Sequence, residues 1–157
     1  MDKGGGSLIN PYMAEALKEA QLAFDKNEIP VGAVIVRDNK IIARAHNLRE
    51  TQGSAIAHAE VLAIQEACRV LSSWRLSDCD LYVTLEPCPM CAGAIVNARL
   101  RSVYFGAWDE KAGCCGSVVQ LMSPGLFNHT PILYDGIMEE PCRELLRRFF
   151  MEKRTEG

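Results

Sequence analysis

The sequence LYVTLEPCPMC, residues 81–91, joins a short apolar and β-branched run to the start of a helix. The run Leu81–Leu85 predicts a buried strand. Pro87 and Pro89 follow it, and because proline is favoured at the first position of a helix, we expect a helix from this point to about Ala98. A buried strand that passes directly into a helix is typical of a sheet covered by helices. This stretch therefore predicts an α/β protein.

Periodicity on either side of this stretch predicts the remaining elements. They are a helix over residues 11–24, a hairpin of strands 31–36 and 41–45 turning at 38–39, a polar stretch over 47–54, a helix over 57–71, strands over 103–105 and 132–134, and a final helix around 142–150. A helix and a hairpin followed by alternating strands and helices favour one architecture. We expect a three-layer α/β/α sandwich with a mixed sheet of about five strands.

Length and composition favour one domain. The chain has 157 residues, of which 48% are hydrophobic, and a chain of this size forms one core. We expect a flexible N-terminal lead over residues 1–7, which are polar and rich in glycine, and a single domain over residues 8–157. The chain has no apolar run near the roughly 20 residues of a membrane span, and residues 1–7 lack the pattern of a secretory signal. We therefore expect no membrane partner and a cytoplasmic location.

Charge and cysteine content restrict the chemistry only slightly. The net charge of −3 gives no support for nucleic-acid binding, for which a strongly basic domain is the usual footprint. The cysteine count is seven, an odd number. Such content fits a reducing compartment, where cysteines serve as core residues, metal ligands or catalytic thiols more often than as disulfide partners.

His58, Cys88 and Cys91 form a candidate zinc site. One imidazole and two thiolates are ligands that suit zinc. Cys88 and Cys91 are three positions apart at a predicted helix start, so they lie on one side of a helical turn, where free N–H groups favour thiolates. His58 lies near the start of another predicted helix. Three protein ligands leave a fourth position open for water, as in catalytic zinc sites.

Glu60, two positions after His58, is expected to act as general acid and base and not as a ligand. Zinc lowers the pKa of bound water to about 7, and Glu60 would move a proton from that water to the substrate ring and the departing ammonia. Each feature alone has a simpler interpretation: a structural histidine, a solvated glutamate, and a Cys-x-x-Cys redox pair. Their joint occurrence at two predicted helix starts favours the metal site.

The His-x-Glu and Pro-Cys-x-x-Cys motifs resemble those of the zinc nucleobase deaminases. A wider similarity, from about Tyr12 to Arg154, resembles the bacterial tRNA adenosine deaminases. It rests on residues 30–34, 45–47, 57–60, 84–94, 109–113, 128–129 and 149–150. The metal motif alone fits cytidine, cytosine or guanine deaminases equally well. The loop 109–113 and the pairs 128–129 and 149–150 favour the tRNA group.

The resemblance implies a cytidine deaminase-like fold and one zinc ion per chain, held by His58, Cys88 and Cys91, with Glu60 as the proton shuttle. It implies hydrolytic deamination of adenosine to inosine at the wobble position, the first anticodon position, of tRNA. It also implies a homodimer in which both subunits shape each RNA site. The implied contacts to the base or the anticodon stem-loop come from Asn47, Ala59, Asp109, Lys111, Asn128, His129 and Phe149.

Without the resemblance these residues have plainer interpretations. Asn47 would cap a turn, Asp109 and Lys111 would be solvated loop residues, and Phe149 would belong to a helix core. An Asn128 that caps a loop and a surface His129 are as consistent with the sequence as RNA contacts are.

Three residues depart from the expected pattern. Trp108 is bulkier than the residue expected before Asp109, and Cys114 and Cys115 replace small residues. An adjacent cysteine pair has poor spacing for joint chelation, so we leave both out of the zinc site. Three alternatives stay open: a deaminase of a free base or nucleoside, a structural zinc or redox module, and an RNA-binding subunit with an idle site.

Overall fold

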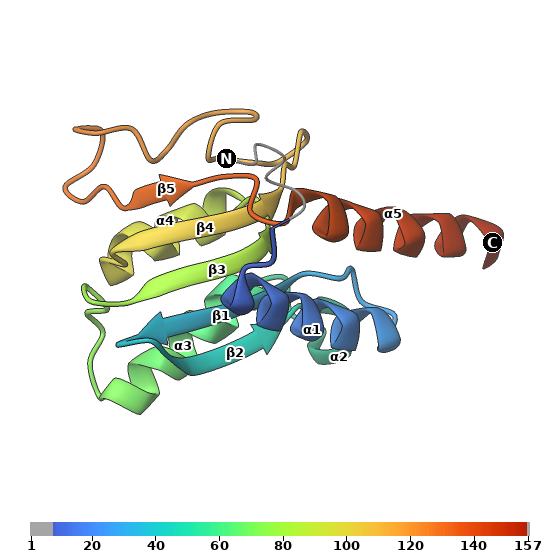
Figure 1. Cartoon of the computed structure of the whole chain (residues 1–157), viewed down its shortest axis with the longest axis horizontal. Helices are drawn as coiled ribbons and strands as arrows, with labels where there is room; N and C mark the ends of the chain where they lie inside the picture. The colour runs from blue at the N-terminus through green and yellow to red at the C-terminus, as the bar shows by residue number, and fades with distance from the viewer. Residues whose placement is uncertain (1–7, 157) are drawn as a thin grey trace.

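The computed structural model describes residues 8–156, so the expected lead over residues 1–7 lies outside the described residues. The elements follow the predicted order (Figure 1). They are α1 (Pro11–Asp25), β1 (Gly32–Arg37), β2 (Lys40–His46), α2 (Arg49–Gln52), α3 (Ala59–Leu71), β3 (Asp80–Leu85), α4 (Pro89–Ala98), β4 (Ser102–Ala107), β5 (Ile132–Tyr134) and α5 (Glu139–Glu156). Within the described residues, no helix is both long and apolar enough to span a bilayer.

The sheet has five strands in the order β2-β1-β3-β4-β5. β1 is antiparallel to both β2 and β3, whereas β3, β4 and β5 are parallel. The hairpin turns at Asp38 and Asn39, whose φ angles of 51° and 62° match the left-handed pair that a two-residue hairpin turn requires. The prediction of a mixed five-stranded sheet is confirmed.

Helices cover both faces of the sheet (Figure 1). The larger core packs α3 and α4 against one face, where β1, β3 and β4 contribute residues such as Ile35, Val83 and Phe105. The smaller core, which includes Met13 of α1 and Cys142 of α5, packs against the opposite face. Alternate residues of each strand supply the two cores, as the pleat of a strand dictates. This arrangement is the predicted three-layer sandwich.

Two local features differ from the sequence-based expectations. The helix expected from residue 57 begins at Ala59, because His58 is its N-cap and has extended backbone angles. The polar stretch 47–54 contains the short helix α2, which the sequence did not predict. The buried carboxylate of Glu28 accepts hydrogen bonds from the backbone N–H groups of Glu50 and Thr51 in this helix. A helix start held by a residue more than 20 positions away leaves no local signal.

The strand directions bring two helix starts to one edge of the sheet. β2 and β3 both run antiparallel to β1, so their carboxyl ends lie at the same edge. α3 follows β2 through α2, and α4 follows β3 directly. The crevice outside the carboxyl ends of strands is the usual place for a ligand in such sheets.

Candidate active site

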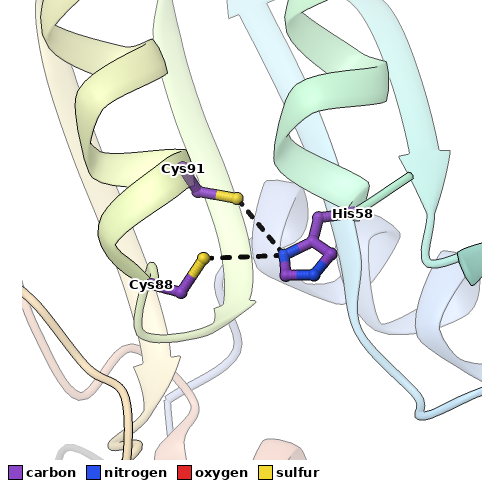
Figure 2. Close-up of side chains that lie close together, drawn as sticks. All are labelled: His58, Cys88 and Cys91. Atoms are coloured by element: carbon purple, nitrogen blue, oxygen red, sulfur yellow. Dashed lines mark hydrogen bonds between the residues drawn. The ribbon is translucent and has the colours of Figure 1, made fainter. Parts of the chain in front are cut away.

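Three potential metal ligands converge where α3 and α4 begin (Figure 2). Nδ1 of His58 lies 3.6 Å from Sγ of Cys88 and 3.5 Å from Sγ of Cys91, and the three ligand atoms all lie within 4.8 Å of one another. A tetrahedral zinc ion, with its usual Zn–N and Zn–S bond lengths, places nitrogen and sulfur about 3.6 Å apart. The three residues therefore fit one zinc ion as they stand.

The helix starts leave these side chains available. His58 and Cys88 are the N-cap residues of α3 and α4, and neither side chain caps its own helix. A hydrogen bond from the Cys91 thiol, with further help from His58, lowers the pKa of Cys88 to about 4. The same bond to Cys88, together with burial, raises the pKa of Cys91. The two shifts are opposite because the sulfurs share a proton, and a metal ion that binds both sulfurs as thiolates releases that proton.

Glu60 lies beside the ligands, in the first turn of α3. Its side chain is buried, and this burial raises its pKa from 4.5 to about 7. A carboxyl group with this pKa binds and releases a proton near neutral pH, as a general acid and base must. The position and protonation of Glu60 thus suit the role expected from the sequence.

A cavity of about 170 Å³ opens at this point. Its volume is below the roughly 300–1,000 Å³ of pockets for drug-sized ligands, so it suits one flat ring better than a whole nucleotide. The cavity brings together six of the predicted site residues: Asn47, His58, Ala59, Glu60, Cys88 and Asp109. Ile29, Val31 and Leu85 add apolar walls.

Asn47 both lines the cavity and holds the backbone around it. Its Nδ2 donates to the carbonyl of Ile29 at 3.2 Å, and its Oδ1 accepts from the N–H of Arg49 at 3.0 Å. The amide still has one N–H and one lone pair free for a ligand. The turn-capping interpretation is therefore correct, and it leaves room for the contact to a base that the resemblance implies.

Asp109 and Lys111 belong to the segment that follows β4. Oδ1 of Asp109 accepts hydrogen bonds from the N–H groups of Lys111 and Ala112 at 3.1 and 3.2 Å. The carboxylate thus shapes its own loop at the wall of the cavity. Lys111 is exposed and does not line the cavity.

The pair Asn128 and His129 lies away from this cavity. Nε2 of His129 is 2.7 Å from the carbonyl oxygen of Leu100, which lies two residues before the start of β4. The cavity lies at the other end of β4, a strand of six residues, or about 20 Å at the usual rise per residue. Within one chain, the structure does not bring this pair to the site.

Phe149 is 5% exposed and packs edge-on against Phe24, with ring centroids 5.7 Å apart. This packing agrees with the helix-core interpretation. Phe149 also lines a second hollow beside the cavity, together with Asn47, Arg49, Phe150 and Lys153. In that hollow the exposed aromatic ring belongs to Phe150.

The three unusual residues lie close to the site but outside the ligand group. Trp108 packs edge-on against Phe105 at 4.9 Å. Cys114 and Cys115 are buried and do not belong to the group formed by His58, Cys88 and Cys91. Their exclusion from the ligand set agrees with this geometry.

Sequence reasoning missed two buried carboxylates. Glu28 and Glu86 are each 1% exposed, and each accepts backbone hydrogen bonds from a segment that walls the cavity. A charged residue that interrupts an otherwise apolar run, as Glu86 does after the strand Leu81–Leu85, was the available signal.

Comparison with known proteins identifies the family of this chain. Residues 9–151 match the MafB19-like deaminases. The tRNA-specific adenosine deaminase of Bacillus subtilis is 54% identical over 92% of this chain and 90% of that protein. A structure from studies of A-to-I editing by tRNA:A34 deaminases at the wobble position of transfer RNA has a TM-score of 0.83. It is 44% identical and covers 86% of this chain and 98% of that one.

A guanine deaminase from Bacillus subtilis is also similar. Its structure is 43% identical with a TM-score of 0.60, over 64% of this chain and 66% of its own. That match covers less of both chains than the tRNA:A34 deaminase structure does. The chain therefore belongs to the MafB19-like deaminase family and, within the relatives compared, to the tRNA-specific adenosine deaminases.

Proposed function

We propose that this protein deaminates adenosine to inosine by hydrolysis at the wobble position of a tRNA anticodon loop. The observation that carries the proposal is the ligand triad of His58, Cys88 and Cys91 with the buried carboxyl of Glu60 beside it, at a cavity the size of one base. The close relatives named as tRNA-specific adenosine deaminases support the choice of adenosine in tRNA.

We further propose one zinc ion per chain, held by His58 Nδ1 and by the sulfurs of Cys88 and Cys91. When bound there, zinc supplies the Lewis acid that makes water a nucleophile at neutral pH. The chemistry of an imidazole and two thiolates suits this metal, and three ligands leave one position open.

Glu60 moves the protons of the reaction. It takes one proton from the attacking water and delivers it to N1 of adenine as the oxygen bonds to C6. Glu60 then carries the proton of the new C6 hydroxyl to the amino nitrogen as the C6–N bond breaks, so that water and adenosine give inosine and ammonia. A carboxyl group with a pKa of about 7 accepts and donates with comparable ease at neutral pH.

Recognition of the RNA extends beyond the cavity. A base that is unpaired in a loop is the kind that a protein can draw into a pocket. Asn47 offers its free amide groups and Ala59 its backbone to this base, and Asp109 and Lys111 lie on the adjoining loop for the RNA backbone. Phe149 contributes through the neighbouring hollow, where Phe150 exposes its ring.

A homodimer explains the distant pair Asn128 and His129, because a second subunit can bring them to its partner's RNA site. The segment 118–132, which contains this pair, exposes large apolar side chains. They are Val118, Val119, Leu126, Phe127 and Ile132, each between 47% and 55% exposed. Light scattering of the purified protein tests the dimer.

We propose a single domain over residues 8–157 and a cytoplasmic location, where tRNA is processed.

The deciding experiment compares substrates. The protein is incubated with an anticodon stem-loop that carries adenosine at the first anticodon position, and separately with adenosine, cytidine, cytosine and guanine. Nuclease digestion and mass spectrometry then detect inosine. We expect turnover of the stem-loop, and turnover of the small molecules alone would refute the proposal in favour of a free-base or nucleoside deaminase.

The Glu60→Ala variant separates an enzyme from a metal-binding module. We expect it to keep its metal, measured by elemental analysis, and to form no inosine. An unchanged rate would remove Glu60 from the mechanism. Absence of metal from active wild-type protein would remove zinc from the proposal.

A further inference from the structure

Glu86 is a buried acid that the proposed chemistry does not use. It follows the last residue of β3 and directly precedes Pro87 and the ligand Cys88. Glu86 is 1% exposed, although it borders the cavity. A buried carboxylate is costly unless it is fully hydrogen-bonded, so its partners indicate what it does.

All of its side-chain partners lie in the segment 109–117. Oε1 accepts from the N–H of Asp109 at 2.9 Å and from the hydroxyl of Ser117. Oε2 accepts from the N–H groups of Cys115 and Ser117, at 2.9 and 3.0 Å. Each oxygen therefore receives two donors, which is the full capacity of a carboxylate. With its lone pairs occupied in this way, Glu86 has no acceptor site left for a substrate.

The segment is built to approach this carboxylate closely. A Cβ atom added to Gly113 would lie 2.2 Å from Oε1 of Glu86, a distance that no side chain can tolerate. The N–H of Cys114 also donates to the carbonyl of Pro87 at 2.8 Å. The segment thus docks directly on the turn that carries the ligand Cys88.

We propose that Glu86 is a positioning residue for the RNA substrate. Its carboxylate fixes segment 109–117 against the ligand turn, and so places Asp109 and Ala112 as one wall of the cavity. The inference rests on the proposed function for the identity of the substrate, whereas the anchoring of the loop is a property of the chain itself.

Glu86→Gln tests the anchor with little change in size. The amide has one oxygen and one NH₂ group. The NH₂ group therefore faces donors in either orientation: the N–H groups of Cys115 and Ser117, or the N–H of Asp109 and the hydroxyl of Ser117. The segment 109–117 therefore loses two of its hydrogen bonds to residue 86, while the cores on both faces of the sheet keep their contacts. Ser117→Ala is the milder companion, because it removes one of the four donors.

Trp108 reports the loop without reference to activity. It directly precedes Asp109, is 38% exposed and packs on Phe105. The second tryptophan, Trp74, is 62% exposed, and Trp74→Phe leaves Trp108 as the single tryptophan of the chain. In this background we expect Glu86→Gln to shift the emission to longer wavelength and to increase quenching by acrylamide.

The kinetic readout uses the anticodon stem-loop. A wall that contacts RNA in both ground and transition states contributes uniform binding, so we expect KM to rise by about tenfold or more while kcat changes little. Ser117→Ala should shift both readouts in the same direction by a smaller amount. The charge-matched control is Glu66→Gln on α3. The carboxylate of Glu66 forms an ion pair with Arg69 and does not line the cavity, so this variant should change neither readout.

The outcomes separate the two proposals. An unchanged Trp108 spectrum, or a shifted spectrum with an unchanged KM, overturns the positioning role of Glu86. A fall in kcat in proportion to lost metal also overturns it, since that result makes Glu86 a support of the metal site alone. Wild-type protein that is inactive on the stem-loop refutes the proposed function, and the fluorescence of Trp108 still tests the anchor.

Discussion

Replacing Glu60 with glutamine should make the metal-free protein more stable and the enzyme inactive. The carboxyl of Glu60 is buried in the first turn of α3, and burial raises its pKa from 4.5 to about 7. Because the folded state binds the proton more tightly than the unfolded state does, ionisation of Glu60 opposes folding. Glutamine has almost the same shape and no charge to bury.

The magnitude follows from the two pKa values. A rise from 4.5 to about 7, at 1.36 kcal/mol per pH unit, corresponds to about 3 kcal/mol. The contribution of Glu60 to stability is intact below pH 4.5. It falls as the pH rises from 4.5 to about 7 and is constant above that range. Relative to the wild type, Glu60→Gln should therefore gain up to about 3 kcal/mol between pH 4.5 and pH 8.

Urea unfolding of both metal-free proteins at pH 5 and pH 8 measures this difference. Inosine formation by the zinc-loaded proteins should fall by about 10²- to 10⁴-fold in the variant, the usual worth of a general acid and base. Glu66→Gln, an exposed change on the same helix, is the control. Parallel pH dependence of stability in wild type and Glu60→Gln would refute the burial argument, and retained activity would refute the proton-transfer role.

Three further outcomes are expected. Removal of metal by a chelator should abolish inosine formation and added zinc should restore it; activity that is indifferent to chelators would contradict the metal site. Burial raises the pKa of Glu28, but hydrogen bonds from Thr51 and Glu50 outweigh this and lower it overall. Its stabilisation is therefore present above pH 4.5 and lost as the pH falls further, and Glu28→Gln should cost about 2 kcal/mol at neutral pH by urea unfolding. Gly32→Ala would place a methyl 2.1 Å from the carbonyl oxygen of Ala16 and should cost about 1–3 kcal/mol or more. Gly93→Ala, with nothing within 4 Å, is its control, and equal melting temperatures would contradict the packing argument.

The fold was predictable because its signals are local. The runs that became β1 and β3 are mostly apolar and β-branched, and Pro89 marks the first residue of α4 as expected. The proximity of Cys88 and Cys91 was predictable for a similar reason, since they are spaced within one helical turn. The convergence of His58 with this pair needed the strand directions, which the sequence only suggested.

The contacts that shape the cavity were not predictable from local pattern. Glu28 binds a helix start 22 and 23 positions away, and Glu86 binds donors 23 to 31 positions away. Nothing in a window of neighbouring residues encodes such pairs. The same limit applies to His129, whose contact with Leu100 places it at the far end of β4 and away from the cavity of its own chain.

Three buried glutamates surround the site, and their partners decide which one carries protons. Glu28 and Glu86 each accept hydrogen bonds from backbone N–H groups in a wall of the cavity, and these contacts order those walls. The Glu60 carboxyl is buried in the first turn of α3, and this burial dominates its pKa. A group that carries a proton in a reaction must be able to gain and lose it at little cost. Because Glu28 and Glu86 both hold segments that wall the cavity, the proposed proton transfer is assigned to Glu60 and not to either of them.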